Sequence, residues 1–209
     1  MSRHCKALLV LAVVTAVSLG SGPERRSAAG RTPRSGAELA AALAAAETEV
    51  KLACAPLLNW DLPLDAAKLA TVGTARALGK LPFAPVVPSF GLAPQVVQVS
   101  DPARVVAADR SVAFVYRFPT GPDFPTNGRV LVKESTATMT NETLRATAAD
   151  PAGSAAVKFR MIRVGSTPAL LTTSSGAGRV QFVRDGVEYD VTGPAVSPAE
   201  VQRLAALVR

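Results

Sequence analysis

Five carboxylates are the residues whose types and spacing could support catalysis. Glu188 and Asp190 alternate along an expected strand, so both side chains lie on the same face of that strand. Asp61 and Asp65 form a second pair near an expected helix start, and Asp123 stands apart from both pairs. Paired carboxylates can bind a hard cation or act as acid and base on a sugar. Because Asp and Glu usually lie exposed, the simpler interpretation is a solvated first pair and a helix-capping second pair.

Histidine and cysteine chemistry is largely missing from the sequence. The single histidine is His4, and the two cysteines are Cys5 and Cys54. His4 and Cys5 fall inside a predicted signal peptide, so the mature chain is expected to lack His-dependent triads and His-ligated metal sites. Cys54 is expected to be a small buried hydrophobe, and Gly176 and Gly178 a turn, because a strand pattern follows them. We therefore assign no catalytic, cofactor-binding or metal-binding residue and expect no cofactor.

The first residues carry the pattern of an export signal. Arg3 and Lys6 precede an apolar or small run from Ala7 to Leu19, and small residues follow it. This pattern predicts a signal peptide over residues 1–20 and an extracytoplasmic protein, secreted or associated with the cell envelope. A retained membrane anchor is the alternative, but the run is shorter than the roughly 20 residues that a spanning helix needs.

The positive charge is concentrated ahead of the expected domain. The whole chain carries a formal charge of +7, whereas the part from Ser35 onward has 17 basic and 15 acidic residues. Residues 21–34 lack apolar periodicity and are predicted to be a disordered linker whose basic tail spans Arg25 to Arg34. Peripheral contact of this tail with anionic lipid or wall polymer and a solvated spacer both stay open. A nucleic-acid partner is not expected, because the domain itself shows no basic patch.

Residues 35–209 are predicted to form a single domain that begins with helices. Ser35–Glu38 has the form of a capping box at a helix start. Apolar residues at helical spacing predict that this helix continues to the region of Pro56: Leu39, Leu43, Ala46, Val50 and Ala53. A second helix is expected over Pro63–Leu78. The four prolines of residues 82–94 predict an extended segment packed across the fold.

Strand patterns dominate after Pro94. Strands are expected near residues 96–99, 112–118, 129–136, 157–161 and 169–173, while residues 140–150 fit either a short helix or a loop. Asp185-Gly186 predicts a two-residue hairpin turn that places Phe182 opposite Tyr189 and Val180 opposite Val191. In this register Glu188 and Asp190 point away from those four residues, toward water.

The chain is predicted to end in a helix. Ser197–Glu200 forms a second capping box with Pro198 at the first helical position. The apolar stripe of this helix consists of Val201, Leu204, Ala205 and Val208. The expected fold class is therefore α+β: an antiparallel β-sheet meander with helices packed on one face, N-terminal helices and a C-terminal helix.

Three segments of the expected domain also suggest a family. They are VQFVRDGVEYDVTGPAVSPAEVQRLAALV, the proline-rich LPFAPVVPSFGLAP and the shorter VGSTPALL. In the order and pattern of these segments, residues 65–209 resemble an extracytoplasmic domain of unknown function found in Gram-positive envelope proteins that are anti-sigma-factor-like or lipoprotein-like. The resemblance implies an exported sheet-and-helix module tied to envelope sensing, and it implies no catalytic residues.

The function expected from the sequence is that of a non-enzymatic extracytoplasmic binding or sensing module of the cell envelope. The sheet is expected to bind an apolar ligand or a partner along one face, with a lipid or an envelope protein as the partner. Two alternatives stay open. One is an extracytoplasmic hydrolase that uses carboxylates such as Asp123, Glu188 or Asp190, and the other is a structural protein associated with the wall.

Overall fold

The computed structural model describes residues 36–46, 48–53, 74–119, 128–149, 156–194 and 196–208. Several sequence predictions lie outside these residues: the signal peptide, the linker with its Arg25–Arg34 tail, Ser35, Cys54, Asp61, Asp65 and Asp123. Among the helices of the described part, none has the length and apolar character needed to cross a membrane.

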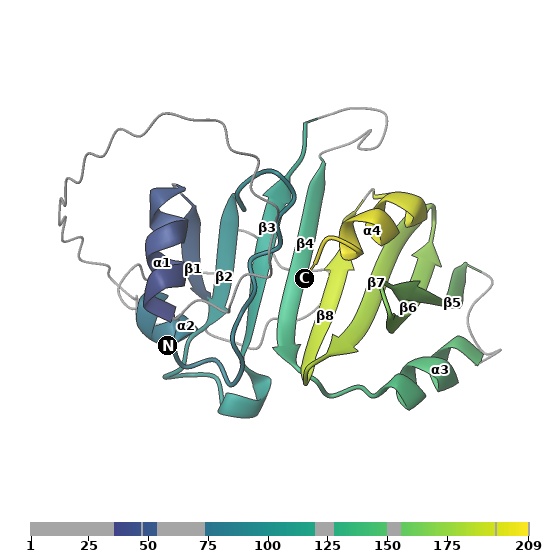
Figure 1. Ribbon diagram of the computed structural model, residues 1–209, viewed down its shortest axis with the longest axis horizontal. Coiled ribbons are helices and arrows are strands. Elements are labelled where there is room, and N and C mark those ends of the chain that lie inside the picture. Colours follow the sequence, from purple (N-terminus) through teal and green to yellow (C-terminus); the bar gives the residue numbers. More distant parts are fainter. Residues whose placement is uncertain are drawn as a thin grey trace, which may run out of the picture.

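Eight strands form one sheet in the order β1-β2-β3-β4-β8-β7-β6-β5 (Figure 1). They are β1 Glu49–Ala53, β2 Val96–Ser100, β3 Ser111–Arg117, β4 Arg129–Thr136, β5 Val157–Val164, β6 Thr167–Ser174, β7 Ala177–Arg184 and β8 Val187–Thr192. Neighbouring strands are antiparallel except β1 and β2, which pair in parallel. The last four strands form consecutive hairpins that bring β8 back beside β4. The helices are α1 Gly36–Ala45, α2 Thr74–Leu78, α3 Asn141–Ala149 and α4 Pro198–Ala205, with a short η1 at Ala107–Asp109. The predicted α+β fold with a mostly antiparallel sheet is confirmed.

The first helix is shorter than predicted. It ends at Ala45, and Val50 and Ala53 belong to strand β1 instead. The residues of β1 alternate in character, and the alternation places Val50 and Leu52 on the face that packs against the core. A hydrogen bond from Thr48 Oγ1 to the carbonyl oxygen of Pro94 (2.8 Å) fixes the entry of the strand beside β2. Long-range pairing thus overrides the helix propensity of an alanine-rich run.

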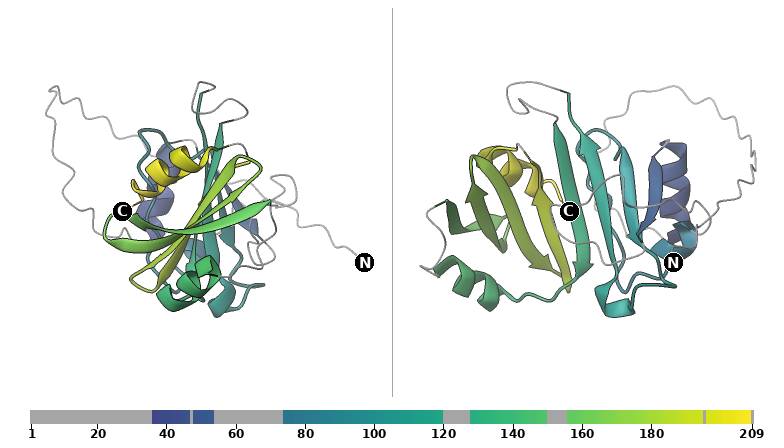
Figure 2. Two further views of the ribbon diagram at one scale, coloured as in Figure 1. Left: turned by 90° about the vertical axis from the view of Figure 1, so that its right-hand side faces the viewer. Right: turned by 180° about the vertical axis from the view of Figure 1, so that it is seen from behind.

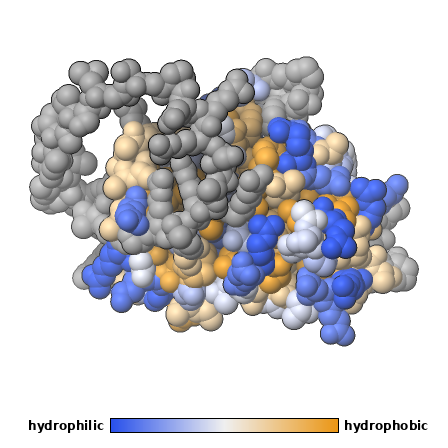
Figure 3. All heavy atoms as spheres, viewed as in Figure 1, coloured by the Kyte–Doolittle hydropathy of each residue, from blue (hydrophilic) through white to orange (hydrophobic). Residues whose placement is uncertain are grey.

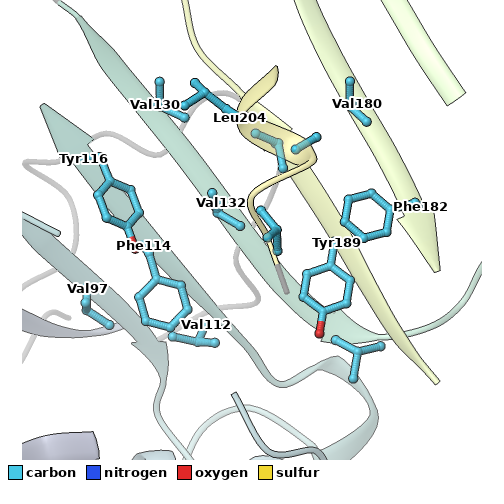
Figure 4. Packing of buried hydrophobic residues seen from close by; sticks show 14 of the residues in the cluster. Val97, Val112, Phe114, Tyr116, Val130, Val132, Val180, Phe182, Tyr189 and Leu204 are labelled. Carbon is cyan, nitrogen blue, oxygen red and sulfur yellow. The ribbon is translucent and has the colours of Figure 1, made fainter. Parts of the chain in front are cut away.

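The front face of the sheet carries the core. We define it as the face formed in the centre by Val112, Phe114 and Tyr116 of β3, which are fully buried (Figure 4). The buried leucines of α1, the end of α2 and the apolar stripe of α4 join the same cluster. In the side view of Figure 2, α1 and α4 lie on the same side of the sheet. The expectation of helices on one face therefore holds for α1, α2 and α4.

The C-terminal hairpin and helix form as the sequence predicts. Phe182 pairs with Tyr189 and Val180 with Val191, and the first pair of rings stacks at 4.9 Å between centroids. Asp185 and Gly186 both have positive φ, as a two-residue hairpin turn requires. The cap of α4 is also confirmed, because Ser197 Oγ accepts a hydrogen bond from the Glu200 amide (3.2 Å).

Gly178 of β7 has a packing role. A Cβ atom at this position would lie 2.6 Å from Val201 Cγ1 and 2.7 Å from Pro198 Cα. Such distances are far below van der Waals contact, so only glycine lets α4 approach the sheet this closely. Gly176 lies in the two-residue turn between β6 and β7, as predicted, whereas the prediction of a turn was wrong for Gly178, which belongs to β7.

Residues 81–94 form an extended segment, the strap, which crosses the front face without regular structure, as the four prolines predict. Tyr116 Oη donates a hydrogen bond to the carbonyl oxygen of Pro88 (2.8 Å), and the Phe90 ring packs edge-on against the Tyr116 ring. The Val86 amide donates to Glu134 Oε2 (3.0 Å). The strap therefore shields β3 and β4 in the centre of the front face.

Residues 141–149 form a helix, α3, which the sequence left undecided. It packs against β5 and β6 at the far end of the sheet, and its Leu144 is fully buried. Leu170 of β6 points to the back face, opposite to Ala169 and Leu171, yet it is also buried. We infer that α3 shields this end of the back face.

Candidate functional site

The carboxylates that the sequence singled out lie on the back face of β8. Glu188 and Asp190 share this face, as predicted. Asp190 does not point into water, however: it is only 3% exposed and forms a two-pronged ion pair with Arg179. Arg179 Nε lies 2.8 Å from Asp190 Oδ1, and Nη2 lies 2.6 Å from Oδ2. The prediction of a solvated Asp190 was wrong, because a cation from the neighbouring strand β7 neutralises the carboxylate inside the sheet.

Glu188 and Lys133 lie beside this ion pair on the back face. Glu188 Oε2 accepts hydrogen bonds from the Thr138 amide (3.3 Å) and from Thr138 Oγ1 (3.1 Å). Lys133 of β4 lies directly opposite Asp190, and burial lowers the pKa of its ammonium group while Asp190 and Glu188 oppose that effect. Two carboxylates thus face two cations, and each carboxylate already has protein partners. The described residues contain no group of three or more His, Cys, Asp and Glu side chains placed to hold a metal ion.

A buried carboxyl that the sequence analysis overlooked lies on the front face. Glu134 is fully buried between Val112 of β3 and Tyr189 of β8. Burial raises the pKa of this carboxyl to about 8, although the hydrogen bond from the Val86 amide opposes the shift. The group is therefore mostly protonated at neutral pH. The alternation of RVLVKEST places Glu134 on the same face as Val130 and Val132. A charged residue at an inward-facing position of a strand could therefore have identified this carboxyl from the sequence.

Further polar atoms surround Glu134. Glu134 Oε1 and Thr136 Oγ1 are buried without a hydrogen-bond partner. Burial and the nearby Glu134 raise the pKa of the Tyr189 hydroxyl to about 12, so this hydroxyl stays protonated. The Phe182 and Tyr189 rings stack beside this group (Figure 4). Because the strap and the core enclose these atoms, they contribute to packing and offer no open surface to a ligand.

An open cavity lies at the carboxyl ends of the parallel strands β1 and β2. Its volume is about 370 Å³. The described residues that line it are Leu52, Arg76, Lys80, Asp101, Pro102, Ala103 and Arg110. They come from the end of β1, from α2 and the residues after it, and from the connection between β2 and β3. In Figure 3, hydrophilic side chains gather at the lower left of the front face, where Figure 1 shows α2.

Arg110 is the most firmly held side chain of this cavity. Its Nε donates to the carbonyl oxygen of Val105 (3.0 Å), its Nη1 to that of Lys80 (2.9 Å) and its Nη2 to that of Pro102 (3.1 Å). These three carbonyls come from two segments far apart in the sequence. The guanidinium is therefore fixed in place, while no carboxylate is among these partners to cancel its charge.

Asp101 is the single carboxylate among the described lining residues. Its Oδ1 accepts a hydrogen bond from the Ala103 amide (2.9 Å), which is the local turn that Asp favours after a strand. Its Oδ2 lies 3.7 Å from Nε of Arg104, an exposed side chain outside the lining. No motif marks this site in the sequence, because its side chains meet only when β1, α2 and the β2–β3 connection pack together.

An apolar binding surface does not stand out among the described residues. The one large hydrophobic side chain that is clearly exposed there is Val106, at 65%. The front face, where the sequence pattern suggested uncovered apolar surface, is covered by α1, α2, α4 and the strap.

Comparisons with known proteins add no relative. No family model, no curated protein and no solved structure matches this chain. The resemblance to an extracytoplasmic domain family therefore stays a prediction.

Proposed function

We propose that this chain is a non-enzymatic binding module that works on the extracytoplasmic side of the membrane, in or near the cell envelope. The observation that carries the proposal is the cavity at the carboxyl ends of β1 and β2. It is open to solvent, and Arg110 is held in a fixed position within it. Fixed polar groups in a concave site are typical of ligand binding, because the protein orders few side chains when the ligand arrives.

Binding is favoured over hydrolysis by the state of the back-face carboxylates. A hydrolase of this kind needs one carboxyl to give up a proton and another to accept one or attack. Asp190 is neutralised by Arg179, and Glu188 accepts two hydrogen bonds from Thr138. Neither carboxylate lines the cavity. A catalytic role for this pair would thus require both carboxylates to leave structural contacts, and Asp123, the third carboxylate of that alternative, lies outside the described residues.

The extracytoplasmic part of the proposal comes from the sequence pattern of residues 1–20. Intact-mass measurement of protein recovered outside the cytoplasm tests it. We expect a chain that has lost about the first twenty residues, as cleavage after the small residues that follow the apolar run would give. A mass that still includes this segment would contradict cleavage and favour a protein anchored in the membrane by its first residues.

A titration tests the binding claim. The full chain, labelled with ¹⁵N, is mixed in turn with the polymer, lipid and small-molecule fractions of an envelope extract. We expect amide shifts at Leu52, Ala103 and Arg110 with at least one fraction, and no turnover of any fraction. Turnover that disappears in Glu188→Gln would contradict the proposal, since this variant retains an acceptor for Thr138 and loses only the ionisable group. Shifts confined to the back face would place binding elsewhere and remove the support that the cavity gives.

A further inference from the structure

We infer that the cavity at the carboxyl ends of β1 and β2 binds a small organic phosphate, in which a phosphate group is joined to a short organic part. This inference rests on the proposed function and adds the chemical class of the ligand. Its support comes from the charge of the lining, the fixed position of Arg110, the placement of two further cations and the size of the cavity.

The lining carries an excess of positive charge. Three described lining residues are cationic, Arg76, Lys80 and Arg110, and one is anionic, Asp101. The formal charge of the described lining residues is therefore +2. The Asp101 carboxylate is also partly satisfied by the Ala103 amide and by Arg104. An anionic ligand would offset this excess without displacing a protein carboxylate.

Arg110 is prepared for an anion. A guanidinium has five N–H groups in a rigid plane, and three of them here donate to main-chain carbonyls. None of these three partners is a carboxylate, so the formal positive charge of the guanidinium is not cancelled by them. Arginine held in this way favours phosphate, whose oxygens accept charge-assisted hydrogen bonds.

Arg76 and Lys80 support the same ligand from one side. Arg76 lies in α2 and Lys80 lies in the turn that follows the helix, and both line the cavity. A shared anion in the cavity gives both cations a partner.

The size of the cavity and its apolar walls indicate a ligand larger than an inorganic ion. The volume of about 370 Å³ is at the small end of the range for organic ligands. Leu52, Pro102 and Ala103 supply apolar wall beside the cations. A phosphate ester with a short carbon chain or one sugar matches this division between a basic side and an apolar side.

The test is a calorimetric titration of the full chain at low ionic strength with four probes: glycerol 3-phosphate, glycerol, inorganic phosphate and vesicles of phosphatidylglycerol. We expect glycerol 3-phosphate to bind more tightly than inorganic phosphate, and glycerol not to bind. Vesicle binding would assign the phosphate to a lipid headgroup, and its absence would assign it to a soluble ester. Equal binding of glycerol and glycerol 3-phosphate, or no binding of any phosphate probe, would overturn the inference.

Variants locate the binding. Arg76→Gln/Lys80→Gln should weaken the binding of glycerol 3-phosphate about tenfold, because this variant removes two exposed cations that line the cavity. The matched control Lys158→Gln/Arg160→Gln removes two cations from β5, away from the cavity, and should leave affinity within about twofold. Asp101→Asn retains the acceptor for the Ala103 amide and should tighten binding a few-fold. Equal losses in the double variant and its control would show nonspecific charge attraction and overturn the inference.

The two proposals fail differently. Cavity shifts with an envelope fraction, combined with no binding of any phosphate probe, would reject the phosphate ligand and leave the binding function intact. Turnover that depends on Glu188 would reject the binding function whatever the phosphate probes do.

Discussion

Glu134 provides the sharpest link between the structure and a measurable quantity. Its pKa rises from an ordinary value of 4.5 to about 8 in the folded chain, mainly because the carboxyl is buried. A carboxyl with a raised folded pKa binds its proton more tightly in the folded state than in the unfolded state. Its contribution to stability is therefore fully present below pH 4.5 and is lost as the pH rises through about 8.

The perturbation is Glu134→Gln, which replaces the protonated carboxyl by a neutral group of the same shape. Its amide oxygen can still accept from the Val86 amide. Glutamine has no ionisable group, so the free energy of unfolding of the variant should not depend on pH through this position. Between pH 5 and 8, the free energy of unfolding of wild type should fall relative to that of the variant by about 1.4 kcal/mol for each unit that the pH rises. Over that window the total is on the order of 4 kcal/mol.

The assay is equilibrium urea denaturation of both chains at fixed ionic strength, repeated at half-unit steps from pH 4.5 to pH 9. Glu142→Gln on the exposed surface of α3 is the matched control for the loss of one carboxylate. A wild-type-minus-Glu134→Gln difference that stays flat across the window would refute the reasoning. It would mean that the carboxyl gains water or a new partner when it ionises.

The remaining stability predictions concern α4 and the back face, and equilibrium denaturation checks each. Ser197→Ala removes the cap of α4 and should cost about 1 kcal/mol, whereas an unchanged midpoint would show that the cap contributes nothing. Gly178→Ala forces a Cβ atom into Val201 and should cost about 1–3 kcal/mol, and a neutral result would mean that α4 can shift outward freely. Arg179→Met leaves the Asp190 carboxylate buried without its cation and should cost about 3–5 kcal/mol. Arg179→Met/Asp190→Leu should recover most of that loss, and a double variant no better than the single one would contradict the pairing.

The best-predicted parts of the fold are those with short-range signals. The Asp185-Gly186 turn fixes the register of β7 and β8, because a two-residue loop allows only one pairing of the strands. The Ser197 cap and the stripe behind it likewise define α4 within a few residues. The prolines of the strap predict its extended form, since they exclude helix and central strand.

The parts that the sequence does not predict depend on partners that are distant in the chain. β1 follows an alanine-rich helix and is a strand only because β2, more than forty residues later, pairs with it. Asp190 is buried because Arg179 reaches it from the neighbouring strand. Arg110 is held partly by a hydrogen bond to the carbonyl oxygen of Lys80. These two residues are separated in the sequence by the strap, so no local sequence pattern predicts their contact. The candidate site could therefore be located only in the folded chain.

Native mass spectrometry of the full chain incubated with an envelope extract tests the binding claim most directly, when wild type is compared with Ala103→Trp. The Ala103 side chain is exposed and lines the cavity, so tryptophan at this position should fill the space without disturbing the core. We predict that wild type retains a small ligand, that Ala103→Trp retains none, and that the two chains unfold at the same urea concentration. Equal retention by both chains, or no retained ligand in wild type, would contradict the assignment of this cavity as the binding site.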